Sequence, residues 1–304
     1  MQLFLQSAYL SSALSLVYIA LLYRSHPFRR LPLVSVFATF IVGMLAVVPV
    51  MLVYRLIPGL KPDGMLGALL TAPLVEESVK LSLFAWTAKR LGYPSLIEPL
   101  DFAITFGILG VGFAIYEDFW YIFGNSYPSW VSGDISRFTE VFRWMMYARS
   151  FPGHILFDAL AGFFIGWGVC QSKRNSRWIW YVGAFLVAAG THGLFNLVAS
   201  QRGTLLLWSL VVGYVGAFLI LRRHVLEVSP FSAIRDFIKG GRLVWDYEIS
   251  PAKILFAEGF SWPRKAKPSY LAFYPVTFSL VVLFPVLVIC VYFMHRLLSM
   301  GVAT

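Results

Sequence analysis

Eight apolar segments, each about 20 residues long, constrain this chain more than any other feature of its sequence. A helix needs about 20 mostly apolar residues to cross the hydrocarbon core of a bilayer. Only 13% of the residues are charged, against roughly 25% in soluble domains. The sequence therefore predicts an all-α fold, a polytopic membrane helix bundle with about eight transmembrane helices. The predicted spans are residues 3–23, 32–57, 65–88, 101–123, 151–171, 178–200, 204–221 and 271–295.

The basic residues between these segments predict the orientation of the chain. Of the 25 Lys and Arg residues, 17 fall on one side of the predicted bundle and 7 on the other. Loops rich in Lys and Arg stay in the cytoplasm, so both the N-terminus and the C-terminus are expected to be extracytoplasmic. This placement accounts for the net charge of +10, and no nucleic-acid partner is expected. Cys170 and Cys290 lie in apolar runs, which argues against a disulfide framework and against a cysteine-based zinc site.

The predicted spans divide the chain into three parts. Residues 1–221 are expected to form a seven-span membrane domain, with a catalytic core at residues 65–200. Residues 222–270 carry nine Lys and Arg residues, and they are expected to lie at the cytoplasmic face against anionic lipid. Residues 271–304 hold the eighth span and a short tail.

Charged residues inside the predicted spans point to a buried polar site. A charged side chain at the centre of a span costs about 2.5–3.5 kcal/mol, even on the mildest scale. Pairing, protonation or contact with water can offset this cost, and all three gather the polar side chains in the interior of the bundle. The ionisable residues within the spans are Glu76, Glu77, Lys80, Glu117, Asp118, His154, Asp158 and His192.

The spacing of these residues supports a single cluster. Residues four apart lie on the same face of a helix, and four consecutive spans each carry a polar pair at that spacing. Asp118 and Arg149 are instead expected at the membrane interface. Pro73 is expected to free a carbonyl and bend its helix toward the cluster. The four pairs are Glu76 and Lys80, Glu117 and Tyr121, His154 and Asp158, and His192 and Asn196.

Carboxylates and histidines in a membrane leave several functions open. A buried glutamate can take a proton from water and so hydrolyse a bond without a metal. The same residue types can bind a metal ion, with Glu76, Glu117, His154 and His192 as ligands. A proton-coupled transporter would use the carboxylates as a relay, and a non-catalytic binding protein would not depend on Glu76. The sequence lacks His-Glu-x-x-His, which argues against a zincin-type metalloprotease.

Four short motifs in order carry a family resemblance. They are EESVK, FAIYE, HILFD and HGLFN, each on its own predicted span between Glu76 and Asn196. This pattern resembles the PrsW-type glutamic intramembrane proteases, which share a superfamily with the CAAX-prenyl endopeptidases and the Abi proteins. In the CAAX-prenyl branch the first motif usually ends in Arg and the second in His. Lys80 and Glu117 stand at those positions here, which is the PrsW-like pattern.

The resemblance implies a metal-independent intramembrane endopeptidase that needs no cofactor. Glu76 or Glu77 would be the general base that activates water. Glu76 is preferred, because Glu77 would then remain free to pair with Lys80. Glu117 would help to position the water or to protonate.

The resemblance also implies supporting roles and a class of substrate. His154 and His192, together with Asn196, would bind the oxyanion or the water, and Asp158 would orient a histidine. The substrate would be a membrane protein or peptide, with a single-span anti-sigma factor as one candidate. The chain would be a multi-pass protein of a prokaryotic cytoplasmic membrane.

Overall fold

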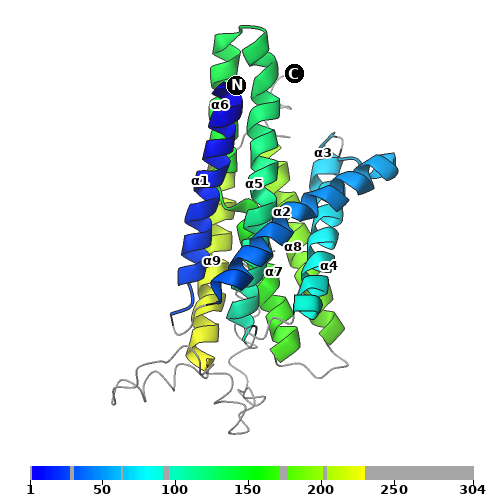
Figure 1. Cartoon of the computed structure of the whole chain (residues 1–304), viewed down its shortest axis with the longest axis vertical. Helices are drawn as coiled ribbons and strands as arrows, with labels where there is room; N and C mark the ends of the chain where they lie inside the picture. Colours follow the sequence, from blue (N-terminus) through cyan, green and yellow to red (C-terminus); the bar gives the residue numbers. More distant parts are fainter. Residues whose placement is uncertain are drawn as a thin grey trace, which may run out of the picture.

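The structure is a computed structural model, and it describes residues 2–27, 31–62, 64–91, 96, 98–170, 177–200 and 204–229. All regular structure in these residues is helical, as the sequence predicts (Figure 1). The long helices are α1 (Gln2–Arg24), α2 (Leu33–Leu56), α4 (Ala72–Leu91), α5 (Pro99–Val131), α6 (Ile135–Arg149), α7 (Gly153–Cys170), α8 (Arg177–Ser200) and α9 (Thr204–Val228). The short ones are η1 (Pro58–Leu60), α3 (Gly64–Leu66) and the π-helical turn η2 (Gly67–Thr71).

Helix α5 lies at the centre of the bundle. Every residue from Pro99 to Ala114 is buried, and the helix packs against α1, α2, α6 and α7. Glycine allows close approaches between these helices: a Cβ on Gly162 of α7 would lie only 2.6 Å from the Cα of Ala103 on α5. Small residues at helix interfaces let backbones approach closely in membranes. The two helices that carry Glu117 and His154 are therefore held tightly together.

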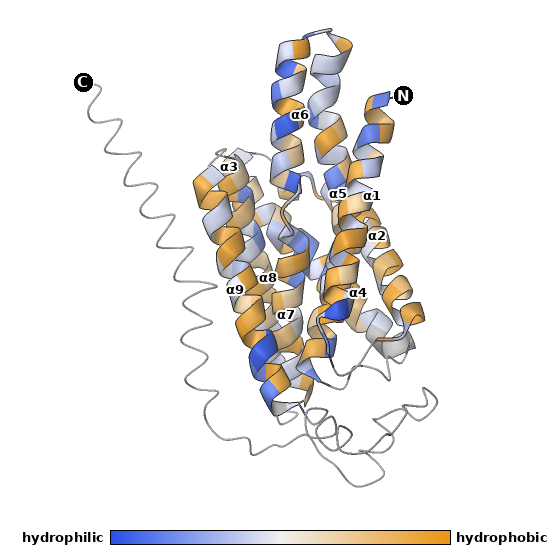
Figure 2. Ribbon diagram, turned by 90° about the vertical axis from the view of Figure 1, so that its left-hand side faces the viewer, coloured by the Kyte–Doolittle hydropathy of each residue, from blue (hydrophilic) through white to orange (hydrophobic). Residues whose placement is uncertain are grey.

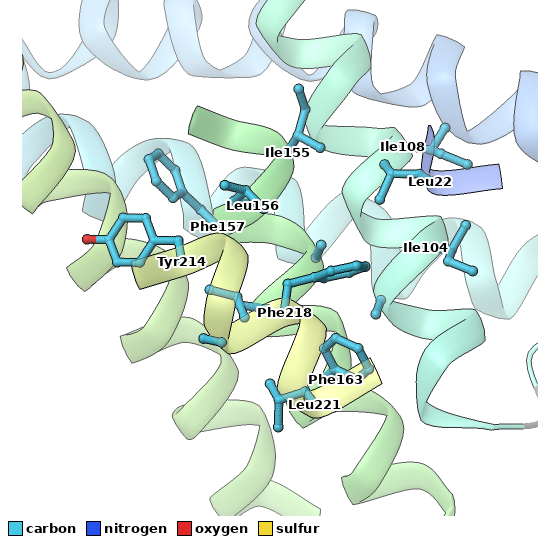
Figure 3. Packing of buried hydrophobic residues seen from close by; sticks show 14 of the residues in the cluster. Leu22, Ile104, Ile108, Ile155, Leu156, Phe157, Phe163, Tyr214, Phe218 and Leu221 are labelled. Carbon is cyan, nitrogen blue, oxygen red and sulfur yellow. The ribbon is translucent and has the colours of Figure 1, made fainter. Parts of the chain in front are cut away.

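The main apolar core lies beside this α5–α7 contact. Phe157 and Phe163 of α7 pack with Tyr214 and Phe218 of α9, and Leu22 of α1 joins the same cluster from the far side of α5 (Figure 3). Many large apolar side chains are exposed on the outer surface, among them Leu21, Val34 and Leu205. Figure 2 shows hydrophobic residues along most of the helices. Large apolar surfaces exposed around a bundle are expected where the surrounding solvent is lipid.

Six helical segments in the described residues are long and apolar enough to cross a membrane. The predicted span at 65–88 is not among them: α3, η2 and α4 cover it in three stretches, and α4 carries three buried charged residues (Glu76, Glu77 and Lys80) in its middle. The predicted span at 271–295 lies outside the described residues. The structure therefore confirms an all-α bundle with several spans, and it bears out six candidates rather than eight.

Residues 124–150 differ from their expected form. The sequence predicts a connection with an interfacial stretch, but α5 continues through Pro128 to Val131 and α6 returns beside it as a helical hairpin (Figure 1). Gly133 makes the turn with a φ of 71°, a conformation that glycine adopts without a steric penalty. Asp134 then caps α6 by accepting a hydrogen bond from the Arg137 N–H at 3.0 Å. Local turn and cap chemistry thus extends the helices beyond the span.

Candidate active site

Four helices bring the predicted site residues into one buried cluster. Helix α4 contributes Glu76, Glu77 and Lys80, α5 contributes Glu117, α7 contributes His154 and Asp158, and α8 contributes His192. Except for the partly buried Glu117, these side chains are almost entirely removed from the surface. A buried charge needs a charged or hydrogen-bonding partner, so the contacts among these groups show which of them are already engaged.

Lys80 is the cation at the centre of the cluster. Its Nζ lies 2.9 Å from both carboxylate oxygens of Asp158 and 2.8 Å from Glu77 Oε2. It also donates to His154 Nδ1 at 3.2 Å and lies 5.1 Å from the centre of the Phe113 ring. Asp158, which was expected to orient a histidine, therefore contacts Lys80 with both oxygens, and Lys80 contacts His154.

Glu76 and Glu77 are adjacent in sequence but have different surroundings. Glu77 has a charged or polar neighbour at each oxygen: Oε1 accepts a hydrogen bond from His192 Nδ1 at 2.8 Å, and Oε2, which has no hydrogen bond among the described residues, forms an ion pair with Lys80 Nζ at 2.8 Å. Glu76 Oε1 accepts a hydrogen bond from the Tyr54 hydroxyl of α2 at 3.2 Å. Glu76 Oε2 is buried without a hydrogen-bond partner in the part of the chain that the structure describes, and it lies 3.8 Å from His192 Nε2.

On the other side of the cluster, Glu117 joins two basic groups. Its Oε2 accepts hydrogen bonds from His154 Nε2 and from Arg149 Nη2. Arg149 also donates through Nε to Asp118 at 2.6 Å, and its guanidinium lies 4.4 Å from the centre of the Tyr121 ring. Asp118 and Arg149, which are expected at the membrane interface, thus also contact the polar cluster: Arg149, at the end of α6, pairs with both acids of α5.

Aromatic rings surround the two histidines. Phe157 stacks on His192 with ring centroids 5.4 Å apart and an interplanar angle of 17°. Phe113 meets His154 edge to face at 4.9 Å, and the two histidine rings lie 4.5 Å apart. A cavity of about 20 Å³ lies beside His154, large enough for about one water molecule. The imidazoles therefore sit in a largely apolar enclosure with room for little water.

A π-helical turn with backbone carbonyls that contact α8 precedes α4. Pro73 has no N–H to donate to the preceding turn, and that turn is π-helical. Asn196 Nδ2 donates to the Ala68 carbonyl of this turn at 3.2 Å, and a Cβ on Gly193 would overlap the Leu69 carbonyl oxygen. Asn196, which was expected beside the water or the oxyanion, is instead seen holding α8 against the turn that precedes Glu76.

Two residues of the cluster were not singled out as site residues from the sequence. Tyr54 lies near the end of an apolar span, where a tyrosine is ordinarily an interfacial residue. Arg149 lies five residues before His154, in a segment that is predicted to be interfacial. Their only sequence signal is their closeness to a helix end, which many membrane-interface residues share. The helix packing shows that they contact Glu76 and Glu117.

Three of these residues can share a metal ion. Glu76, His154 and His192 are buried, and each offers one ligand atom within 4.8 Å of the other two. His192 is oriented for this purpose, because its Nδ1 contacts a carboxylate while its Nε2 faces Glu76. His154 suits it less well, since Lys80 and Glu117 already occupy both of its ring nitrogens. The donor set therefore fits a metal ion only if His154 gives up one of these contacts.

The fold and this cluster define a multi-pass membrane protein with a buried carboxylate–histidine site. The model of the PrsW family intramembrane metalloproteases matches residues 31–221, more than half of the chain. The chain therefore belongs to the PrsW family and is an intramembrane protease. The matched range covers every residue of the cluster. No curated protein and no solved structure matches the chain.

Proposed function

We propose that this protease hydrolyses a peptide bond of a membrane-protein substrate with a water activated by Glu76, without a metal ion. The observation that carries the proposal is the unpaired Glu76 Oε2, which lies 3.8 Å from His192 Nε2 inside a buried site. That distance is too long for a direct hydrogen bond and is suited to a bridging water. Glu77 is the weaker candidate for the base, because both of its oxygens are engaged.

The two atoms that face each other across this gap suit a nucleophilic water. A carboxylate oxygen can only accept, so the Glu77 contact assigns the proton of a neutral His192 to Nδ1. His192 Nε2 then presents a lone pair, as ionised Glu76 does. A water between them donates one hydrogen to each, and its oxygen lone pair points to the substrate. Glu76 takes the proton as the oxygen adds to the carbonyl carbon, and returns it to the leaving amine when the C–N bond breaks.

The remaining groups hold this arrangement in place. Lys80 bridges Glu77 and Asp158, and so offsets the negative charge beside the proposed base. Lys80 donates to His154 Nδ1, so the proton of a neutral His154 is on Nε2, where Glu117 accepts it. We assign this N–H as the donor to the oxyanion once a substrate carbonyl displaces Glu117. A donor of this kind is worth about 3–4 kcal/mol of transition-state stabilisation.

The decisive experiment compares Glu76→Gln with Glu77→Gln, His192→Ala and an exposed control, Glu227→Gln. Each purified chain is reconstituted in liposomes with single-span membrane proteins, one at a time, and the products are identified by mass spectrometry. Loss of the general base should lower the rate at least about 100-fold. Glu227→Gln should leave it unchanged. Full activity of Glu76→Gln would refute the role of this residue.

The second candidate is a metal-dependent hydrolase. It is favoured by the family's description as metalloproteases and by the shared approach of Glu76, His154 and His192. These three residues would hold the ion, which would polarise the scissile carbonyl and lower the pKa of a bound water. The Lys80 ammonium, 3.2 Å from His154 Nδ1, argues for the metal-free form because it already places a positive charge there.

Metal content separates the two candidates. The metal-free mechanism predicts equal metal content in the parent chain and in His192→Ala. The metal-dependent mechanism predicts loss of cleavage on chelation, restoration by added Zn²⁺, and one equivalent of metal less in His192→Ala.

The same proposal includes the topology and the partners. We propose eight spans with both termini extracytoplasmic in a prokaryotic cytoplasmic membrane, a single-span anti-sigma factor as substrate, and anionic lipid against residues 222–270. The asymmetry of 17 against 7 basic residues supports the orientation. Labelling of single cysteines placed at 59 and 226 with a membrane-impermeant reagent tests it. Only the cysteine at 59 should react in intact cells.

A further inference from the structure

A second buried polar cluster lies at the opposite end of α5 and α7 from the candidate active site. His26 follows the end of α1, Glu98 is the residue that caps α5, and Asp101 lies in the first turn of that helix. On α5, Asp101 and Glu117 are 16 residues apart, as are Cys170 and His154 on α7. At 1.5 Å per residue, both pairs are separated by about 24 Å. The two clusters are therefore separate sites.

The three side chains converge on a common point. His26 Nε2 contacts Glu98 Oε1 and lies 3.9 Å from Asp101 Oδ1. Each residue offers one ligand atom within 4.8 Å of the other two, and none is more than 2% exposed. Tetrahedral coordination with bonds of about 2.0–2.2 Å places ligand atoms roughly 3.3–3.6 Å apart. Small shifts of these side chains would therefore bring them around one ion.

A second observation, the environment of the Glu98 carboxylate, also supports a cation at this site. Glu98 and Asp101 form a reciprocal capping box at the start of α5. Even so, Glu98 Oε2 is fully buried and has no hydrogen-bond partner among the described residues. A buried carboxylate oxygen without a partner is costly, and an ion that coordinates it removes that cost.

Cys170 supplies a possible fourth donor. It is the last residue of α7 and is partly buried, and it lies outside the group of His26, Glu98 and Asp101 whose donor atoms are within 4.8 Å of one another, so its side chain would have to shift to join them. Nitrogen, carboxylate oxygen and thiolate sulfur are the three donor types that protein zinc sites use. Sequence alone argues against a cysteine-based zinc site, because Cys170 and Cys290 both lie in apolar runs. Helix packing brings His26 together with Glu98 and Asp101 from two distant segments, and Cys170 ends the helix that packs against α5.

We propose that His26, Glu98, Asp101 and Cys170 bind a divalent transition-metal ion such as Zn²⁺. Four protein donors would complete the tetrahedral shell, which is the form of a structural site rather than a catalytic one. The ion would join the end of α1, the start of α5 and the end of α7. It would thereby brace the two helices that carry Glu117 and His154, from the end opposite to these residues.

The test begins by removing the other candidate metal ligands. The full chain with His154→Ala and His192→Ala, purified without a polyhistidine tag, is loaded with Zn²⁺, dialysed and analysed for metal. About one zinc per chain is expected to remain. Glu98→Gln or Cys170→Ser, added to this background, should release it, and the matched controls Glu227→Gln and Cys290→Ser should not.

A second measurement tests the thiolate ligand directly by absorption spectroscopy. Loading the background chain with Co²⁺ should give a thiolate-to-cobalt charge-transfer absorption, which Cys170→Ser removes and Cys290→Ser retains. Zinc should also raise the melting temperature of the background chain. A background chain that retains no zinc, or that retains as much after Glu98→Gln, would overturn the proposal. The activity of the protease does not enter either measurement, so the outcome is independent of its catalytic mechanism.

Discussion

Replacing Lys80 by Met tests whether one ammonium group makes the buried acids of this bundle tolerable. Lys80 is fully buried, and its Nζ contacts Asp158 with two distances of 2.9 Å and Glu77 with one of 2.8 Å. Methionine keeps an unbranched side chain of similar length in the same space. The substitution therefore removes the charge and leaves two carboxylates in the core without their cation.

The expected loss of stability follows from these contacts. Removing one partner of a buried ion pair costs about 3–5 kcal/mol, because the remaining charge is left uncompensated. Lys80 serves two acids, so the loss should lie at the upper end of that range. For a chain of this size, each kcal/mol corresponds to about 2–4 °C, and the melting temperature should fall by roughly 10–20 °C. Adding Asp158→Asn removes one stranded charge and should recover about 1–3 kcal/mol.

The assay is thermal unfolding in one detergent, followed by tryptophan fluorescence at a fixed scan rate, because such transitions depend on the rate. Lys61→Met is the matched control, since Lys61 is exposed. Its melting temperature should change by no more than about 2 °C, in line with other surface substitutions. If Lys80→Met melts like Lys61→Met, the ammonium does not stabilise the buried carboxylates and the reasoning is wrong.

Three further substitutions test other parts of the structure. Gly110→Ala should lower the free energy of unfolding by about 1–3 kcal/mol, and with it the melting temperature, because the added Cβ would lie 2.7 Å from a carbonyl oxygen of α7. Gly124→Ala is the matched control on the same helix: its Cβ would have nothing within 4 Å, so the melting temperature should rise. Tyr54→Phe removes the hydrogen bond to the proposed base, so cleavage should slow by roughly tenfold or more while the melting temperature changes little. An unaltered cleavage rate would show that the tyrosine has no role in the site. Arg149→Gln removes the ion-pair partner of Glu117 and Asp118 and should lower the melting temperature. Arg143 is exposed, so Arg143→Gln should not lower it. Equal melting temperatures of the two variants would contradict a stabilising role for the ion pairs.

Several features of the site could be predicted from the sequence because they depend on short-range regularities. The four-residue spacing of His154 and Asp158 places both on one face of a helix whatever surrounds it. The cost of charge in lipid then requires Glu76, Glu77 and Lys80 to face the interior. These two arguments predict that the acids, the lysine and the histidines cluster, but they do not identify Tyr54 or Arg149 as members.

The partners within the cluster could not be predicted in the same way. Lys80 is four residues from Glu76 and three from Glu77, and both spacings allow an ion pair. The structure pairs Lys80 with Glu77 and with Asp158, and places Tyr54 against Glu76. Which acid is paired depends on how α2, α4 and α7 are rotated against one another. That rotation is set by packing contacts between residues far apart in sequence.

By itself, then, the sequence determined an all-α membrane protein, the positions of most of its helices and the residues of one buried polar site. Hydropathy, helical period and the cost of buried charge are properties of short segments, and they act before any helix meets another. Tertiary structure decided that Glu76 Oε2 has no hydrogen-bond partner among the described residues, that Arg149 contacts Glu117, and that His26, Glu98 and Asp101 gather at the opposite end of α5. Each of these depends on helix crossings and close glycine contacts, which no single segment encodes.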